Sequence, residues 1–481
     1  MTAVDPSALA RDLADVRDAL DARMAEHRRD LEALVRIPSV SAPGFDPEPV
    51  ARSAEAVRDL LAARGLQVRL LTDARVHPTV YGELRAADPD APTVLLYAHH
   101  DVQPTGDPRR WTTPPFEPSE RDGRLYGRGA ADDKAGVLVH VAAISAWLDA
   151  RGALPVTVKV VVEGEEETAN PHLDEFLDRH ADLLQADALV ITDSVNWKVG
   201  VPALTTTLRG TVQCDVEVAA LDHAVHSGLY GGAVADPVLG LVRMLAGLVD
   251  ADGAVAIPGF ADDAPPIDAA TRARLDALDL DEARFRADAG VLDGVALVGD
   301  PRASVPERLW LRPSATITGI DVPSVAQASN TIQPSARARL SLRLAPGQDA
   351  ARALAVLREW LQQQAPWGLR VTVSQGATAP GFAADPDHPA VATAAAALEA
   401  AYGAPTVFAG VGGSIPIVTS FVRAFSAAKG RPVPALVTGV EDPDSRAHGI
   451  DESLHLGDWR SACLGEAYLL GALAEALEEH R

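Results

Sequence analysis

Five short segments of the chain carry acidic residues or histidine, and each of them follows an apolar stretch. The residues concerned are His99, His100, Asp101, Asp132, Asp133, Glu163, Glu165, Glu166, Glu167, Asp193 and His448. An isolated carboxylate is costly to remove from water, so many carboxylates at the ends of hydrophobic strands indicate that cations lie beside them. These residue types therefore predict metal binding by carboxylate and imidazole groups.

The first segment follows the apolar residues 93–98 and contains His99 and Asp101. Side chains two positions apart in a strand point to the same face, so His99 could bind a metal while Asp101 orients its ring. A single His-x-Asp pair is more often incidental, and it needs support from the other segments. His100 points the opposite way, and we expect it to be structural.

The second segment, YGRGAADDK, places two glycines ahead of a predicted helix. A carboxylate at Asp132 could bridge two cations, with one oxygen on each. Alternatively, Asp132 and Asp133 cap the helix that begins near Lys134. Taken alone, this segment favours the cap.

The third segment places four glutamates directly after the predicted strand residues 158–162, VKVVV. Adjacent Glu166 and Glu167 can divide the chemistry, one as a metal ligand and the other as a proton carrier. Solvated loop carboxylates are the alternative. Asp193 and His448 complete the set; each alone could be a cap or a surface polar group, but all five segments together favour a metal site.

The elements that must position these residues alternate between strand and helix over the first two hundred positions. After an opening helix to about Arg36, strands are predicted at residues 68–71, 93–97, 156–162 and 188–191, and a helix at residues 135–147 that ends near Gly152. This rhythm is typical of an α/β fold with a mostly parallel sheet.

The pattern changes at about Thr207. Apolar and polar residues alternate over residues 210–221 and 336–346, as in half-exposed antiparallel strands, whereas residues 237–249 and 351–364 have helical periodicity. Buried-strand character returns at residues 405–413 and 434–440. We therefore expect a catalytic domain formed by residues 1–206 and 380–481, with an α+β domain of residues 207–379 inserted in it. Residues 259–305 are expected to be an irregular excursion.

Composition excludes several classes of partner. The chain has 481 residues and a formal net charge of -24, which repels nucleic acids and anionic membrane surfaces and favours a small-molecule or peptide substrate. Its two cysteines are too few for a disulfide framework. No export signal and no membrane-spanning apolar run is visible, so a cytoplasmic location is expected.

Eight motifs now identify a family. YAHHDVQP, LYGRGAADDK, EGEEE, ITDS and SRAHGIDE occur in this order, and HSGLYGG, SLRLAPGQD and GGSIPI lie in or near the inserted domain. The chain resembles the di-metal aminoacylase/carboxypeptidase-type metallopeptidases, and within them the cytosolic non-specific dipeptidase and carnosinase branch. The resemblance implies a catalytic domain of phosphorylase/hydrolase-like type whose inserted lid also forms a homodimer.

The resemblance also implies a role for individual residues. One metal would be held by His99 and Asp193, the other by Glu167 and His448, and Asp132 would bridge them. Glu166 would be the general base and Asp101 the partner of His99. His226 would reach the neighbouring subunit's active site, Arg343 and Ser414 would receive the substrate carboxylate, and Gly413 and Asn330 would line the same pocket.

The implied reaction is hydrolysis of a peptide bond in dipeptides or short peptides by a water that bridges two divalent metal ions. We expect zinc, and manganese or cobalt fits the same ligands. An N-acyl or N-carbamoyl amino acid amidohydrolase is the alternative, although Asp at position 193 is typical of the dipeptidase branch. A non-catalytic metal-binding protein is disfavoured because Glu166 and all five ligands are present.

The chain departs from the family pattern at four places. Ala98 replaces a glycine, residues 168–170 replace Gly-Ser, and Gly449 replaces a serine. The charged residue often found before GGSIP is absent, which predicts a less polar substrate pocket. None of these changes removes a ligand.

Overall fold

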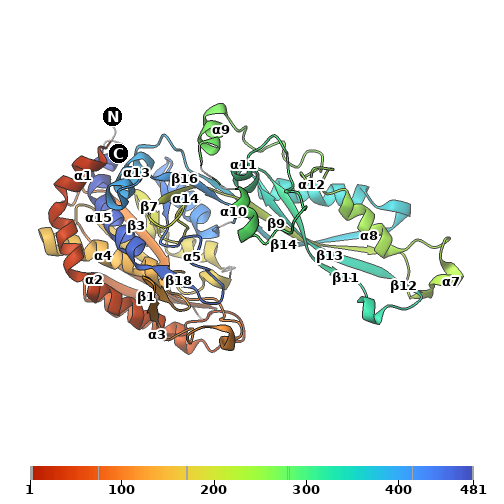
Figure 1. Cartoon of the computed structure of the whole chain (residues 1–481), viewed down its shortest axis with the longest axis horizontal. Helices are drawn as coiled ribbons and strands as arrows, with labels where there is room; N and C mark the ends of the chain where they lie inside the picture. The colour runs from red at the N-terminus through yellow and green to blue at the C-terminus, as the bar shows by residue number, and fades with distance from the viewer. Residues whose placement is uncertain are drawn as a thin grey trace. The chain divides into compact units, whose positions relative to one another are not determined.

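The computed structural model describes residues 4–73, 75–168, 172–278, 280, 282–413 and 415–478. The chain divides into two compact units. The first comprises Met1–Thr206, Ala384–Ala409 and Ile417–Arg481, and the second comprises Thr207–Ala383 and Gly410–Pro416. Figure 1 shows the chain passing from one unit to the other and back. The second unit ends at Ala383 rather than at residue 379, and it also takes up the short segment around Gly413.

The largest sheet among the described residues has nine strands in the order β1-β2-β6-β3-β7-β17-β8-β15, with β16 paired to β8. The strands are β1 (Gln67–Asp73), β2 (Val76–Leu84), β3 (Thr93–His99), β6 (Thr157–Glu163), β7 (Ala188–Ile191), β8 (Ala203–Leu208), β15 (Phe382–Ala383), β16 (Val407–Val411) and β17 (Ala435–Thr438). Strand β3 is parallel to β6 and β7, and β17 is parallel to β7, whereas β1, β2, β8 and β15 pair antiparallel. The predicted α/β class with a mostly parallel sheet is confirmed, with antiparallel strands added at the edges.

Helices cover both faces of this sheet, which explains why β3 is apolar from Val94 to Ala98. Val94, Leu96 and Ala98 belong to a core shared with the helices on one face, while Tyr97 contacts Phe421 on the other. The helices of the first unit are α1 (Pro6–Asp12), α2 (Ala14–Val35), α3 (Glu48–Ala62), α4 (Lys134–Arg151), α5 (Leu173–Arg179), α6 (Ala181–Leu184), α13 (Pro389–Tyr402), α14 (Pro416–Lys429) and α15 (Leu456–Glu478). Helix α4 ends at Gly152 in the left-handed conformation, as the sequence predicted.

The second unit is built on a four-stranded antiparallel sheet in the order β11-β13-β9-β14. Its strands are β9 (Gly210–Ala219), β11 (Ser314–Asp321), β13 (Ser335–Leu344) and β14 (Arg370–Ala379), and the helices α8 (Pro237–Ala246) and α12 (Ala350–Gln363) pack on one face. Buried and more exposed side chains alternate along β13, so Leu340 and Leu342 enter the core while Arg339 faces outward. The predicted alternation therefore corresponds to one covered face.

Residues 259–305 differ from the prediction. This segment contains the short helices α9 (Ala269–Asp276) and α10 (Glu282–Asp288), and α11 (Val305–Trp310) begins at its end. The Asp268 carboxylate accepts a hydrogen bond from the Thr271 backbone N–H and caps α9. Alanine-rich sequence behind such a cap forms helix even where prolines and aspartates suggest a loop.

Candidate metal centre

Four adjacent parallel strands of the first unit deliver most of the acidic and histidine side chains to one edge of the sheet. His99 is the last residue of β3, Glu166 and Glu167 form a short 3-10 turn beyond β6, and Asp193 follows β7 by two residues. His448 lies in the loop after β17. The carboxyl ends of parallel strands meet at one edge, which is where open α/β sheets bind ligands.

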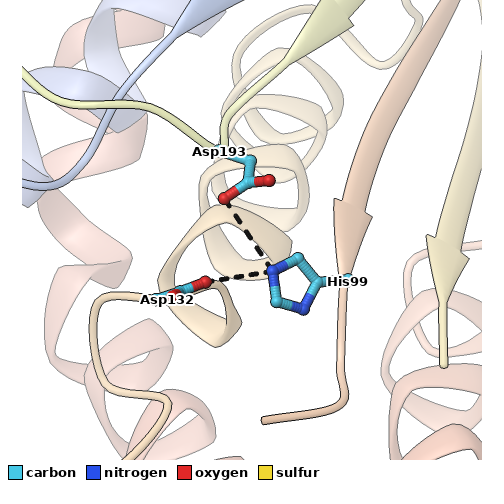
Figure 2. A group of neighbouring side chains, drawn as sticks. All are labelled: His99, Asp132 and Asp193. Atoms are coloured by element: carbon cyan, nitrogen blue, oxygen red, sulfur yellow. Dashed lines mark hydrogen bonds and ion pairs between the residues drawn. The ribbon is translucent and has the colours of Figure 1, made fainter. Parts of the chain in front are cut away.

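The first group of possible metal donors comprises His99, Asp132 and Asp193. His99 Nε2 lies 3.0 Å from Asp132 Oδ1 and 3.8 Å from Asp193 Oδ1 (Figure 2). The His99 side chain is fully buried. Three donors of two residue types thus converge on one small volume.

The second group comprises Asp132, Glu167 and His448. His448 Nε2 lies 2.9 Å from Asp132 Oδ2 and 3.2 Å from Glu167 Oε2. Asp132 belongs to both groups and turns one carboxylate oxygen to each. Asp133 occupies the N-cap position of α4 but makes no side-chain cap bond. The carboxylate of Asp132 lies beside His99 and His448.

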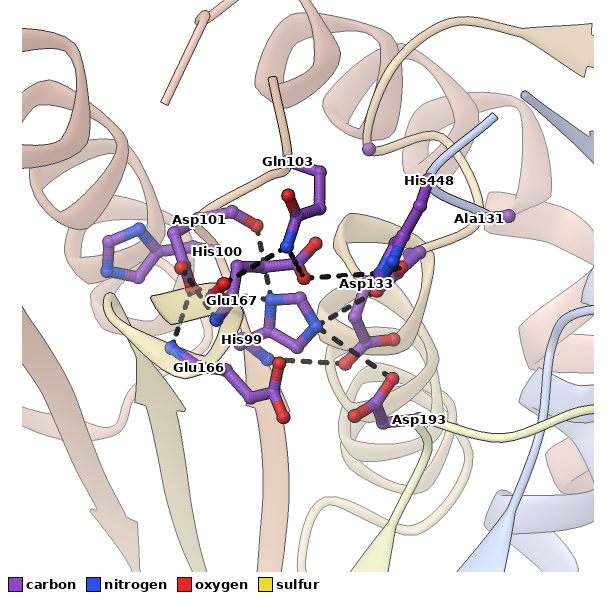
Figure 3. Close-up of polar contacts among 12 residues, drawn as sticks. His99, His100, Asp101, Gln103, Ala131, Asp133, Glu166, Glu167, Asp193 and His448 are labelled. Atoms are coloured by element: carbon purple, nitrogen blue, oxygen red, sulfur yellow. Dashed lines mark hydrogen bonds and ion pairs between the residues drawn. The ribbon is translucent and has the colours of Figure 1, made fainter. Parts of the chain in front are cut away.

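Asp101 and Gln103 contact members of the two donor groups (Figure 3). Asp101 Oδ1 lies 3.4 Å from His99 Nδ1, and the same carboxylate accepts hydrogen bonds from Ser41 Oγ at 2.6 Å and from the Glu167 backbone N–H at 3.1 Å. Gln103 Nε2 donates to Glu167 Oε2 at 2.9 Å and to the Glu167 carbonyl at 3.0 Å. No sequence pattern predicted this role for Gln103.

Neighbouring Glu166 and Glu167 point in different directions in Figure 3. Glu167 faces His448, whereas Glu166 belongs to neither donor group. The backbone N–H of Glu166 donates to Asp101 Oδ1 at 3.3 Å. Both glutamates therefore depend on Asp101 for their backbone position. His100 makes a separate contact, from its Nε2 to the Pro78 carbonyl at 3.0 Å.

The carboxylates of this cluster lie close together, and nearby positive charge would stabilise their ionised forms. Burial raises the pKa of Glu166 well above its ordinary value, and the nearby carboxylates of Asp193 and Glu167 raise it further. Hydrogen bonds that His448 donates to the carboxylates of Asp132 and then Glu167 raise the pKa of His448 to about 11. Five carboxylates share this volume with two imidazoles and no thiolate, a donor set that fits divalent cations such as zinc, manganese or cobalt.

The second unit contains the remaining predicted site residues, and it brings two of them together. His226 lies in β10 (Val225–His226), which pairs with β12 (Thr331–Ile332), and the backbone N–H of Ser227 donates to the Asn330 carbonyl at 2.9 Å. Both His226 and Asn330 are exposed.

Arg343 and Gly413 lie in another part of the second unit. Arg343 is half-buried on β13, where burial lowers the pKa of its guanidinium. Burial, together with the charge of Arg343, lowers the pKa of Arg209 to about 10. Arg209 Nε donates to the carbonyl of Gly412, beside Gly413. Ser414 lies outside the described residues.

Comparison with known proteins identifies the family. Residues 95–470 match Peptidase family M20/M25/M40, so the chain belongs to this family of peptidases. It is 37% identical over 405 residues to the cysteinylglycine-S-conjugate dipeptidase of Corynebacterium striatum, which covers 83% of this chain and 86% of that protein. The predicted resemblance is confirmed.

Solved structures agree with this assignment. The crystal structure of human carnosine dipeptidase 1 has a TM-score of 0.76 at 26% identity and covers 96% of this chain and 99% of that one. An M20 family metallo-carboxypeptidase from Sulfolobus solfataricus has a TM-score of 0.81 at 23% identity, covering 94% and 99%, and this likeness shows the fold. Among the described residues, no helix is both long and apolar enough to cross a membrane.

Proposed function

We propose that the protein is a di-metal dipeptidase that hydrolyses the peptide bond of dipeptides or short peptides. The observation that carries this proposal is the position of Asp132, whose two carboxylate oxygens face His99 and His448. The likeness to a dipeptidase over 83% of the chain supports a dipeptide substrate.

Five residues would hold the metals. His99 and Asp193 would bind one ion, Glu167 and His448 the other, and Asp132 both, in agreement with the two donor groups. When bound, the ions would polarise the scissile carbonyl and lower the pKa of a bound water. We expect zinc, with manganese and cobalt also able to use this donor set.

Glu166 would act as the general base. Its backbone is fixed through Asp101, yet its carboxylate stands outside both donor groups and stays available for proton transfer. A carboxylate in this position can take a proton from water and return it to the leaving amine. Asp101 would keep the His99 ring oriented, because it faces Nδ1 while Nε2 faces the donor group.

Arg343, with Gly413 and Ser414, would receive the substrate carboxylate. His226 would act on the substrate of the neighbouring subunit. Asn330, expected from the sequence in the pocket of Arg343, lies beside His226 instead and would act with it. They lie beside β12, near the start of β13, whereas Arg343 lies near its end. At a rise of about 3.3 Å per residue, β13 separates them by about 25 Å, far more than a dipeptide spans. This separation supports a composite active site to which two subunits contribute residues.

A homodimer through the second unit is therefore part of the proposal. Strand β11 is an edge strand with exposed Ile317 and Ile320, and α8 exposes Leu239 (52%) and Val242 (51%). Unpaired strand edges and apolar helix faces are surfaces that a second copy can cover. Light scattering should give the mass of a dimer, and Leu239→Glu with Val242→Glu should shift it to a monomer.

A cytoplasmic location is also proposed, because Cys214 and Cys463 are both free and buried. The substrate proposal is tested by assaying the zinc- and manganese-loaded protein against dipeptides and against N-acyl and N-carbamoyl amino acids. Turnover of dipeptides is expected. Turnover confined to the N-acyl or N-carbamoyl compounds would identify an amidohydrolase instead.

A further inference from the structure

Glu452 is a buried carboxylate that has no place in either donor group. It closes the SRAHGIDE motif, four residues after His448, and directly precedes the short strand β18 (Ser453–His455). Strand β18 pairs with β5 (Arg124–Tyr126), and β5 leads into the loop that carries Asp132. The fold thus brings Glu452 next to a loop that is remote from it in sequence.

Both carboxylate oxygens of Glu452 accept hydrogen bonds from that loop. Oε1 accepts from the backbone N–H groups of Ala131 at 2.9 Å and Asp132 at 3.1 Å. Oε2 accepts from the backbone N–H of Gly129 at 3.0 Å and from Arg128 Nη1 at 2.6 Å. Charge-assisted bonds of this kind are the stronger ones in proteins, and three of these four hold backbone N–H groups of the loop that ends at Asp132.

Arg128 extends the connection to two further loops. Its Nη2 donates to the carbonyl of Gly449 at 3.1 Å, next to His448, and to the carbonyl of Pro104 at 3.3 Å, in the segment that follows His99 and Asp101. The guanidinium is almost fully buried. One buried ion pair therefore joins the loops that carry Asp132 and His448 to the segment that follows His99.

The His448 loop needs such support. His448 has a φ of 60° and Asp451 a φ of 58°, in the left-handed region that residues other than glycine rarely adopt. Such backbone conformations persist where the surrounding structure holds them. The bonds from Arg128 and the placement of Glu452 at the end of this loop provide that hold.

We infer that Glu452 is a positioning residue of the metal centre. It holds Asp132 in place through three backbone N–H groups, and it holds His448 in place through Arg128. This inference rests on the proposed di-metal centre. Residues that hold metal ligands in place commonly change metal affinity by about 10- to 100-fold when they are replaced. Loss of the Glu452 charge should weaken both metal sites together, because Asp132 belongs to both.

The test compares metal binding by chelator-treated wild-type protein, Glu452→Gln and the control Glu466→Gln in titrations with Zn²⁺ and Mn²⁺. Glu466 is also a buried carboxylate, but it pairs with His140. Glu452→Gln should raise the apparent Kd by at least about 10-fold, and Glu466→Gln should leave it near the wild-type value. In the metal-free proteins, hydrogen exchange at Gly129, Ala131 and Asp132 should be faster in Glu452→Gln only.

Three outcomes would overturn the inference. Wild-type metal affinity in Glu452→Gln, with or without a lower Tm, would show a role in stability alone. Equal loss of affinity in Glu466→Gln would show a general effect of removing a buried charge. Failure of the wild-type protein to bind metal would overturn the metal centre itself and this inference with it. If Glu452→Gln does not fold, Glu452→Asp, which keeps the charge but shortens the reach, should show a smaller loss of affinity, and unchanged affinity there would count against the inference.

Discussion

The imidazole of His448 contacts Oδ2 of Asp132, whereas His99 contacts Oδ1 of the same carboxylate. His99 arrives from the end of β3, while His448 arrives from a loop after β17. A single aspartate thereby connects two sets of donors that come from opposite halves of the chain. The proposed di-metal chemistry depends on this connection.

The neighbouring glutamates should respond differently to the same substitution. Glu166→Gln keeps the size of the side chain and removes the base, so metal content should stay at the wild-type value while kcat falls by at least about 100-fold. Glu167→Gln should instead lose metal, because Glu167 lies 3.2 Å from His448 in a donor group. Elemental analysis and steady-state kinetics measure both effects. The reverse pattern would mean that the two roles are exchanged.

Catalysis should require two subunits. An inactive Glu166→Gln chain mixed with an inactive His226→Ala chain should regain activity, because one composite site of each heterodimer has both residues intact. At statistical exchange, about a quarter of the wild-type activity is expected. Mixing Glu166→Gln with Asp132→Ala is the matched control, since both changes lie in the first unit and no composite site is repaired. Verified subunit exchange without recovery in the first mixture would remove His226 from the neighbouring site.

Acid should destabilise the folded protein through His27. This residue of α2 is buried, and neither ring nitrogen has a hydrogen-bond partner among the described residues. Burial and then the charge of Arg64 lower the pKa of His27 to about 4, although the carboxylates of Glu26 and Asp149 oppose this effect and Arg23 adds to it. The unfolded chain takes up a proton near pH 6.5 and the folded chain does not, so the free energy of unfolding decreases as the pH falls from about 6.5 toward 4.

His27→Leu removes this proton uptake. The Tm of the variant minus the Tm of wild type should therefore increase by at least about 2 °C when the pH is lowered from 7.5 to 5. Thermal unfolding followed by circular dichroism measures this difference. A Tm difference that is the same at both pH values would contradict the assignment.

Sequence patterns predicted the elements whose periodicity is strong. Three features follow from local physical causes that the sequence records. They are the apolar run of β3, the alternation along β13 and the left-handed glycine at the end of α4. Strand β2 carries Pro78 and Gly82, which are typical of turns, and it forms because β1 and β6 pair with it. Helix α15 is buried around most of its surface, so it lacks a clear polar face.

Metal binding could be predicted from the sequence because several segments together supplied suitable ligands. Asp132 alone favoured a helix cap, and only its combination with His99, Asp193 and His448 favoured a metal. Gln103 and Glu452 escaped prediction because their partners are far away in sequence and no local pattern records such bonds. A single glutamine or glutamate in a loop is ordinarily solvated.

The central claim is that Asp132 serves two metal ions, and elemental analysis of three variants tests it most directly. Asp132→Ala should lose both ions, whereas His99→Ala and His448→Ala should each weaken mainly one site, since each histidine belongs to one donor group. Circular dichroism should show that all three variants remain folded. Two metal ions at full occupancy in folded Asp132→Ala would contradict the bridging role and the di-metal mechanism built on it.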